Sequence, residues 1–298
     1  IAPDVQVEVR DGFANRVTTA TNAVTIAFGA NPGSGTLSGL LTVNAVSGIA
    51  TFPGLSVNRT ASGYTLAASS GVLTVATSGA FNIAVGAASP ATSTVSVSSS
   101  TVASGSAVTV TLQTRDASGN NLIAGGLTNV AFTRSGGSST GTYGAVSDNG
   151  NGSYTANFTG VLAGTATTIG ATIGAAAVTS TQAVTVTPGT ISTATSTVSV
   201  SSSTVASGGG VTLTLQAKDA AGNNLTTGLS TVVFARTGGT SSGTISGTTD
   251  NANGTYSATF TGVTAGSATT IGATIGGAAV ASTQAVTVTP GTISTATS

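Results

Sequence analysis

Apolar and polar residues alternate along much of this chain, and the alternation predicts β-strands. In "AVTVTLQTRD" (107–116), Val108, Val110 and Leu112 fall on one face, while threonine and glutamine fall on the other. A period of two is the pattern of a strand that buries one face and exposes the other to water. The segment "GVTLTLQAKD" (210–219) repeats the pattern. Both segments run into "DASGNN" or "DAAGNN", whose Asp, Gly and Asn residues favour a tight turn.

A second kind of strand follows the turn-like "DNGNG" and "DNANG" in "DNGNGSYTANF" (148–158) and "DNANGTYSATF" (250–260). Glycine supplies positive φ angles and Asn or Asp side chains bond to nearby backbone, so the first half predicts a turn. In the second half, Tyr154, Ala156 and Phe158 alternate with polar residues and are expected to point inward. Neither copy contains the spacing of a helix of useful length.

The chain repeats itself. Residues 94–193 and 197–295 align with one deletion and are identical at most positions. A repeat of roughly a hundred residues has the size of a whole domain. Residues 1–90 follow the same plan more distantly, with Val5, Val7 and Val9 on one face of the opening strand. We therefore predict modules at 1–90, 91–193 and 194–298.

The first module differs from the others in one element. Modules two and three each begin with a strand-like "STVSVSSSTVASG", which starts at Ser93 and again at Ser196. The first module starts directly at its valine-rich strand, so its first strand is expected either upstream in a longer protein or from a neighbour. The linker "TPGTISTATS" occurs at 187–196 and again at 289–298, so the third module ends in a linker. The chain is expected to be an excerpt of a longer array or a subunit whose tail meets another copy.

Many short strands with turn signals at regular spacing favour an all-β fold of tandem immunoglobulin-like β-sandwich modules, arranged as an elongated rod. Apolar residues make up 39% of the chain, enough for buried cores. Charged residues make up only 5%, and the formal net charge is zero. The electrostatic footprint of a nucleic-acid-binding or anionic-membrane-binding protein is therefore missing. The uncharged stretch 165–188 is broken by Thr, Gly and Gln, and we interpret it as strands rather than a membrane span.

The order "VTVTLQTRDASGNNL", "DNGNGSYTANFTG", "AGTATTIGATIG", "TQAVTVT" resembles the bacterial immunoglobulin-like modules of the invasin and intimin adhesins and related giant surface proteins. Modules two and three resemble this family along nearly their whole length, and module one resembles a sister type. The resemblance implies modules stacked as a rod-like stalk on the bacterial cell surface, with receptor binding usually left to a separate terminal domain. These motifs identify the module type and say little about function, because such modules serve many roles.

The motifs that could carry catalysis, metal binding, an isopeptide bond or phosphate binding do not predict a site. The chain lacks His and Cys, which excludes Ser-His-Asp and Cys-His catalysis, disulfides, and thiolate or imidazole metal sites. Around Asp148 and Asp250, glycines stand where calcium ligands would be needed, so we predict structural turns. Lys218 corresponds to Arg115 in the second module, which argues against a Lys–Asn isopeptide bond and favours a charge near Asp116 or Asp219. The glycine-rich segments 134–141 and 236–243 lack the P-loop ending and are expected to be flexible connections.

The surface residues leave ice binding, glycan binding and N-glycosylation open. Outward threonines allow ice or glycan binding, although the scarce aromatic residues are patterned mostly inward. Acceptor triplets for N-glycosylation occur at Asn58, Asn151, Asn157, Asn224 and Asn253. We therefore predict no catalytic, cofactor-binding or metal-binding residue, no cofactor, and no enzymatic activity.

The function expected from the sequence is that of a structural stalk or spacer in an extracellular, adhesin-like cell-surface protein. Three modules end to end would reach on the order of 100 Å. The partners are neighbouring modules of the same or a longer chain. An alternative is a filament subunit that polymerises head to tail, with the tail beyond Thr289 donated as a strand to module one. A third is a weak glycan-binding adhesive module.

Overall fold

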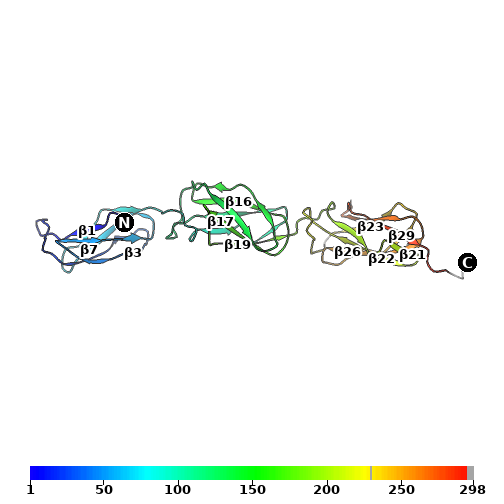
Figure 1. Cartoon of the computed structure of the whole chain (residues 1–298), viewed down its shortest axis with the longest axis horizontal. Coiled ribbons are helices and arrows are strands. Elements are labelled where there is room, and N and C mark those ends of the chain that lie inside the picture. Colours follow the sequence, from blue (N-terminus) through cyan, green and yellow to red (C-terminus); the bar gives the residue numbers. More distant parts are fainter. Residues whose placement is uncertain (229, 294–298) are drawn as a thin grey trace.

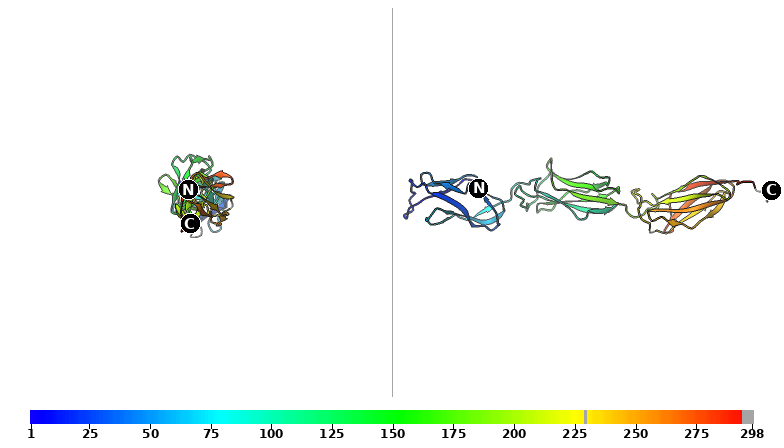
Figure 2. Two further views of the ribbon diagram at one scale, coloured as in Figure 1. Left: turned by 90° about the vertical axis from the view of Figure 1, so that its right-hand side faces the viewer. Right: turned by 90° about the horizontal axis from the view of Figure 1, so that it is seen from below.

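The chain forms a row of separate β-sandwiches. The computed structural model describes residues 1–228 and 230–293, and every regular element within these ranges is a β-strand. Three modules follow one another along one axis (Figure 1), and an end-on view superimposes them (Figure 2). Each module has its own cluster of buried apolar side chains. The predicted all-β fold, with tandem sandwiches in an elongated rod, is confirmed, while the boundaries given above for the modules stay a prediction.

The strands of the first module are β1 (Val5–Glu8), β2 (Ala23–Ala30), β3 (Leu37–Ser38), β4 (Thr42–Asn44), β5 (Ile49–Phe52), β6 (Ser56–Val57), β7 (Ala61–Ser69), β8 (Ala76–Thr77) and β9 (Phe81–Ile83). Those of the second are β10 (Thr94–Val97), β11 (Thr101–Ala103), β12 (Ala107–Gln113), β13 (Val130–Ser135), β14 (Gly141–Tyr143), β15 (Ser147–Asp148), β16 (Ser153–Gly160), β17 (Thr167–Ile173), β18 (Ala176–Ala177) and β19 (Gln182–Thr187). Those of the third are β20 (Thr197–Val200), β21 (Thr204–Ala206), β22 (Gly210–Gln216), β23 (Val232–Thr237), β24 (Ser242–Ile245), β25 (Thr249–Asp250), β26 (Thr255–Thr264), β27 (Thr269–Ile275), β28 (Ala278–Ala279) and β29 (Gln284–Thr289).

Modules two and three share one topology. In module two, one sheet has the order β10-β12-β16-β14 and the facing sheet the order β11-β19-β17-β13. Strands β12 and β16 are antiparallel, and their register places Val108, Val110 and Leu112 opposite Phe158, Ala156 and Tyr154. All of these side chains are buried, as the alternation predicts. Module three repeats the arrangement with β20 to β29.

The segment "STVSVSSSTVASG" forms two strands rather than one. Strand β10 pairs antiparallel with β12, whereas β11 pairs parallel with β19 in the opposite sheet. The chain crosses between the sheets at Ser98–Ser100, where the Ser99 hydroxyl donates to the Thr101 carbonyl at 2.7 Å. The crossing lets Val95 and Val102 enter the same core from different sheets. Local alternation alone does not reveal that a strand changes partners.

The first module is an incomplete version of this plan. Strand β1 pairs with β5, and β7 pairs with β2, β8 and β9. Neither β1 nor β9 has a partner in the places that β10 and β11 occupy beside β12 and β19 in module two. Val5, Val7 and Val9 are half-buried, whereas their counterparts in β12 are buried. That the first strand lies upstream or comes from a neighbour stays a prediction.

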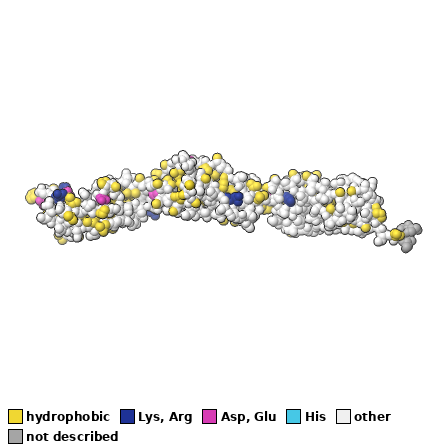
Figure 3. Space-filling view, in the orientation of Figure 1, with side chains coloured by type: hydrophobic (Ala, Val, Ile, Leu, Met, Phe, Trp, Pro, Cys, Tyr) yellow, Lys and Arg dark blue, Asp and Glu magenta, His cyan; other side chains and the backbone are white. Residues whose placement is uncertain are grey.

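The surface is nearly uncharged. Uncharged polar side chains and backbone, drawn in white, make up most of the face seen in Figure 3, with few basic and acidic residues. Among the described residues, no helix is long and apolar enough to cross a membrane.

Because each module has its own core, a core truncation should unfold one module alone. We expect Phe260→Ala to destabilise the third module by about 3–5 kcal/mol, since the ring is fully buried and its loss leaves a cavity. Hydrogen exchange measured by mass spectrometry should show faster exchange in peptides of module three and unchanged exchange in modules one and two. Val233→Ala, at a position 53% exposed in the same module, is the control and should change stability little. Loss of protection in all modules together would contradict independent cores.

Candidate functional site: the junctions between modules

An aspartate turn closes one end of each module. Asp116 Oδ1 accepts hydrogen bonds from the backbone N–H groups of Ser118 and Asn120, both at 2.9 Å. Asp219 Oδ1 accepts equivalent bonds from Ala221 and Asn223, also at 2.9 Å. Glycine is favoured in this turn, because Gly119 has a φ of +81° and Gly222 a φ of +85°. The "D-x-x-G-N" sequence is therefore a turn in which one carboxylate oxygen holds the backbone.

The second carboxylate oxygen holds the linker from the preceding module. The N–H of Gly86 donates to Asp116 Oδ2 at 3.1 Å, and the N–H of Gly189 donates to Asp219 Oδ2 at 2.8 Å. Each linker then continues along the turn: Ser89 N–H donates to the Arg115 carbonyl at 2.7 Å. Ser192 N–H donates to the Lys218 carbonyl at 2.8 Å in the same way. The linkers are thus bound along their length rather than free.

The asparagine of the turn reaches back to the preceding module. Asn120 Nδ2 donates to Asp116 Oδ2 at 2.9 Å and to the Asn58 carbonyl of module one at 3.1 Å. Its Oδ1 accepts a hydrogen bond from the Thr60 N–H at 3.4 Å. One amide side chain therefore joins the carboxylate of its own turn to a loop of the previous module.

The second junction repeats this contact with shorter distances. Asn223 Nδ2 donates to Asp219 Oδ2 at 2.8 Å and to the Val161 carbonyl of module two at 2.9 Å, and Ala163 N–H donates to Asn223 Oδ1 at 2.8 Å. We call each set of an aspartate, its asparagine, the linker glycine and the loop of the preceding module a junction clasp.

Three of the four clasp side chains, Asp116, Asn120 and Asp219, are buried, and Asn223 is half-buried. Asp116 is 6% exposed, Asn120 8% and Asp219 1%. Clefts of about 530 and 520 Å³ flank the second junction. The backbones approach closely there, since a Cβ on Gly189 would lie 2.5 Å from the Ser104 carbonyl oxygen. Directional hydrogen bonds therefore contribute to how one module is oriented on the next.

The clasp bonds favour the charged carboxylates. Burial raises the pKa of Asp116, but hydrogen bonds from the Asn120 side chain and from the N–H groups of Gly86, Asn120 and Ser118 outweigh it, and the pKa lies below its ordinary value. Burial also raises the pKa of Asp219, and bonds from Gly189 N–H, from the side chain and N–H of Asn223, and from Ala221 N–H again leave it lowered. Each carboxylate is therefore held in its ionised form at neutral pH.

The other acids singled out in the sequence form turns. Asp148 Oδ1 accepts from Gly150 N–H at 2.9 Å and Oδ2 from Gly126 N–H at 2.7 Å, and these bonds hold the pKa of Asp148 below its ordinary value. Asp250 Oδ1 accepts from Ala252 N–H at 2.8 Å. In the described part of the chain, no three His, Cys, Asp or Glu side chains group together as a metal site would require.

Two expectations about basic and glycine-rich residues need correction. Arg115 does not pair with Asp116: its Nε donates to Asn121 Oδ1 at 3.0 Å, because the carboxylate of Asp116 is already used by the clasp. The segment 134–141 is not a free connection. Ser139 is buried and accepts from Val186 N–H at 2.9 Å, and Ser138 N–H donates to the Thr165 hydroxyl at 2.9 Å.

Sequence reasoning recognised the "D-x-x-G-N" turn but missed its role between modules. The linkers carry no acid, so the acid that binds them comes from the following module. A usable signal was present: the turn and the linker recur together in both junctions, and "DGFAN" at the start of the chain repeats the turn. In this first copy Asp11 Oδ1 accepts from Phe13 and Asn15 N–H groups, both at 2.9 Å. Ala14 takes the glycine position with a φ of 67°.

These features define a modular all-β protein of tandem immunoglobulin-like sandwiches joined through short, hydrogen-bonded linkers. Residues 89–189 and 192–291 each match the family model described as invasin, domain 3. The chain belongs to this family, and it is built of adhesin-type modules. This confirms the resemblance drawn from the sequence for modules two and three.

Solved structures of surface proteins are similar to the chain. Invasin, described as a bacterial integrin-binding protein, is 20% identical over 96% of this chain and 56% of that chain, with a TM-score of 0.46. FdeC, described as a broadly conserved Escherichia coli adhesin, is 25% identical over 96% of this chain and 91% of that chain, with a TM-score of 0.46. InvD of Yersinia pseudotuberculosis is 28% identical over 68% and 59% of the two chains, with a TM-score of 0.41. The chain spans little more than half of the invasin structure, and no curated protein matches it.

Acid should loosen the clasps before it unfolds the cores. A carboxylate whose pKa is lowered by folding contributes stability above its unfolded pKa, and this contribution is lost as the pH falls through the folded value. We therefore expect the second junction to be intact at neutral pH and to loosen below about pH 4. Spin labels on Thr142→Cys and Thr244→Cys, at exposed positions of modules two and three, report the distance between modules.

The distance distribution should be narrow at pH 7 and broad at a pH below the lowered pKa of Asp219. Asp219→Asn should broaden it already at pH 7, because the neutral amide replaces the charged acceptor. A label pair within module two, on Thr101→Cys and Thr142→Cys, is the control and should give the same distribution at both pH values. An inter-module distribution that stays narrow at low pH would contradict the role given to Asp219.

Proposed function

We propose that this chain is a non-catalytic stalk segment of an extracellular, adhesin-type protein on a bacterial cell surface. The observation that carries the proposal is the junction clasp, which occurs in the same form at both junctions and orients each module on the next. A stalk needs neighbouring modules that resist bending, and the clasp bonds resist it. The partners of each module in this account are its neighbours along the chain.

The chemistry of the surface supports a passive role. The described residues bring together no three His, Cys, Asp or Glu side chains that could hold a metal ion, and the sequence has neither His nor Cys. Phe13, which is 90% exposed on the first aspartate turn, is an isolated aromatic residue rather than part of a sugar-binding platform. With a net charge of zero, the surface offers long-range attraction to neither nucleic acid nor anionic lipid.

The free energy of the junction hydrogen bonds is large enough to limit bending between modules. Hydrogen bonds to a charged group contribute about 1.5–3 kcal/mol each, and about 1.4 kcal/mol changes an equilibrium tenfold. A clasp with several such bonds can therefore keep bent arrangements rare. Losing the asparagine amide leaves its partners in the preceding module unbound, while the turn keeps its backbone bonds to the aspartate.

Removing both asparagines should bend the rod without unfolding it. We expect Asn120→Ala with Asn223→Ala to weaken each junction by about 1–3 kcal/mol and to populate bent arrangements. Small-angle X-ray scattering should show a shorter mean end-to-end dimension and a broader distance distribution, with melting of the modules nearly unchanged. Asn157→Ala, at an exposed position of β16, is the matched control and should scatter like the parent chain. An unaltered scattering curve for the double variant would contradict the stalk mechanism.

A second candidate is a filament subunit that polymerises head to tail. The open edge of β1 favours it, because an unpaired strand is a template for a strand from another chain. The tail argues against it: residues 289–293 contain Pro290 and a single large apolar side chain, Ile293, and residues 294–298 lie outside the described residues. Light scattering across a range of concentrations separates the two candidates. A constant monomer mass supports the stalk, and a mass that grows with concentration supports the filament.

A further inference from the structure

A cleft of about 540 Å³ opens at the first junction, between modules one and two. Two polar residues of module one and several of module two line it, among them Arg59, Thr60, Arg115, Asn120, Asn121 and Ile123. The lining contains two arginines and no acid. The whole chain has only seven basic residues, so this cleft concentrates positive charge on a surface that is otherwise nearly neutral.

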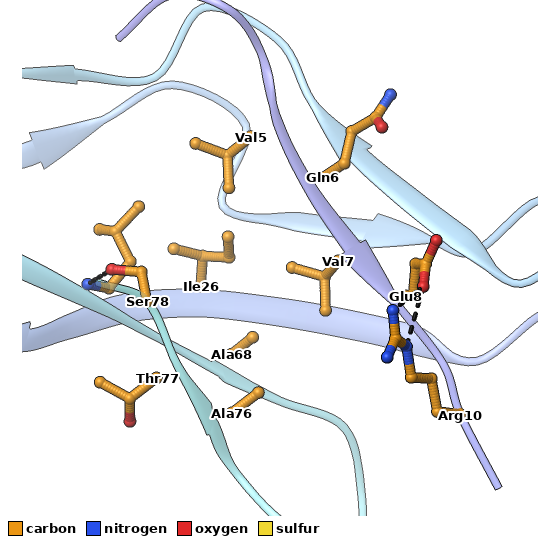
Figure 4. Close-up of a pocket in the computed structure, with 11 residues that line it drawn as sticks. Val5, Gln6, Val7, Glu8, Arg10, Ile26, Ala68, Ala76, Thr77 and Ser78 are labelled. Carbon is orange, nitrogen blue, oxygen red and sulfur yellow. Dashed lines mark hydrogen bonds and ion pairs between the residues drawn. The ribbon is translucent and has the colours of Figure 1, made fainter. Parts of the chain in front are cut away.

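Neither arginine of the cleft has an acidic partner. The single ion pair among the described residues joins Arg10 to Glu8 at 2.6 Å, beside β1 (Figure 4). Arg59 and Arg115 form none within the same residues. Asp116 directly follows Arg115, but both of its oxygens accept hydrogen bonds of the clasp. Because two guanidinium groups that share a cleft repel each other, the cleft favours an anion.

The hydrogen-bond donors of the cleft suit an oxyanion. Arg115 Nε donates to Asn121 Oδ1 at 3.0 Å, which orients the guanidinium and leaves its terminal nitrogens without a partner among the described residues. The Arg59 side chain is exposed and makes no hydrogen bond in this part of the chain, since only its carbonyl accepts one. A guanidinium presents a fork of N–H groups that matches two oxygens of a phosphate or sulfate. Two such forks on one cleft can hold a tetrahedral anion with two negative charges.

The second junction lacks this pair of arginines. The clasp bonds on either side correspond, and they place Leu162 where the first junction has Arg59. Lys218 stands where the first junction has Arg115. Leu162 is 45% exposed, and a lone lysine is a point charge without a fork. The arrangement that suits an oxyanion is therefore found at the first junction and not at the second.

The first clasp also has the longer hydrogen bonds. Thr60 N–H donates to Asn120 Oδ1 at 3.4 Å, whereas Ala163 N–H donates to Asn223 Oδ1 at 2.8 Å. The bonds from the two asparagine amides to carbonyls of the preceding modules measure 3.1 and 2.9 Å. The junction with the weaker clasp is thus the one at which each module contributes an arginine to a shared cleft.

We propose that the cleft between Arg59 and Arg115 binds a doubly charged tetrahedral oxyanion, sulfate or hydrogen phosphate, which links module one to module two. Each guanidinium donates hydrogen bonds to the anion, and the Thr60 hydroxyl and the Asn121 amide of the same cleft are further donors. The bound anion neutralises both arginines and adds a connection across the junction. The binding does not depend on the stalk role, whereas its effect on stiffness rests on that role.

The test titrates the whole chain with sodium sulfate and follows backbone amide shifts by NMR. Sodium chloride at equal ionic strength is the reference, because general screening is then the same in both titrations. We expect the amides of Thr60 and Asn121 to shift and to reach half-saturation at about 1–10 mM sulfate. The matching amides of the second junction, Ala163 and Asn224, should not shift.

A parallel titration with glucose 6-phosphate identifies the source of the anion. Its phosphate monoester has the same charge and shape as the free ion but carries a sugar. Weaker binding than that of sulfate supports the free ion as the ligand. Tighter binding supports the same oxyanion site with a phosphorylated sugar as its ligand.

Variants make the test specific. Arg59→Leu installs the residue of the second junction and should weaken sulfate binding about tenfold or more, since one fork is lost. Arg16→Leu removes the same charge from an exposed position outside the cleft and should leave binding unchanged. In the reverse direction, Leu162→Arg with Lys218→Arg should create a second sulfate site at the second junction.

Spin labels on Thr42→Cys and Thr142→Cys, at exposed positions of modules one and two, measure the link between the modules. Saturating sulfate should narrow their distance distribution, and chloride at equal ionic strength should not. An unchanged width with sulfate bound would overturn the link. The oxyanion site is overturned by shifts that chloride reproduces, by acetate binding as tightly as sulfate, or by full binding to Arg59→Leu. None of these results decides the stalk role, because the scattering test of the asparagine variants is made without sulfate or phosphate.

Discussion

In Asp116 and in Asp219, the two carboxylate oxygens bind different parts of the chain. One oxygen holds the backbone of the turn in its own module, and the other accepts the linker N–H and the side-chain amide of the turn asparagine. The carboxylate can hold the linker only when its own turn is formed, so folding of a module creates the binding site for the linker that precedes it. Orientation along the rod is in this way coupled to the fold of each module.

The cores and the junctions are stabilised by different interactions. Each core buries small β-branched and aromatic side chains between two sheets, so we expect the stability of the chain to be close to a sum over modules. The junctions contain directional hydrogen bonds to charged carboxylates, which are stronger than bonds between neutral groups. Such bonds fix an orientation even where clefts remain beside them. A nearly uncharged exterior leaves little electrostatic interaction between neighbouring modules to compete with the clasp.

Alternation in the sequence predicts the strands and the inward faces well, because a sheet with one wet face imposes a period of two. Residues such as Tyr154 and Phe158 are buried as expected. Which strands pair with each other is harder to predict. The sequence pattern of β10 and β11 predicts one strand, yet the two strands pair in different sheets. The junction clasp could not be predicted from the sequence either. Asn223 and Val161 are far apart in sequence, and their contact depends on the orientation of two folded modules.

Residual dipolar couplings on the weakly aligned chain measure the central claim most directly, since they report whether modules two and three tumble as one body. If the clasp fixes their orientation, one alignment tensor fits the amides of both modules at neutral pH. If the junction is a free hinge, each module requires its own tensor with a different magnitude, and the account of the clasp is wrong.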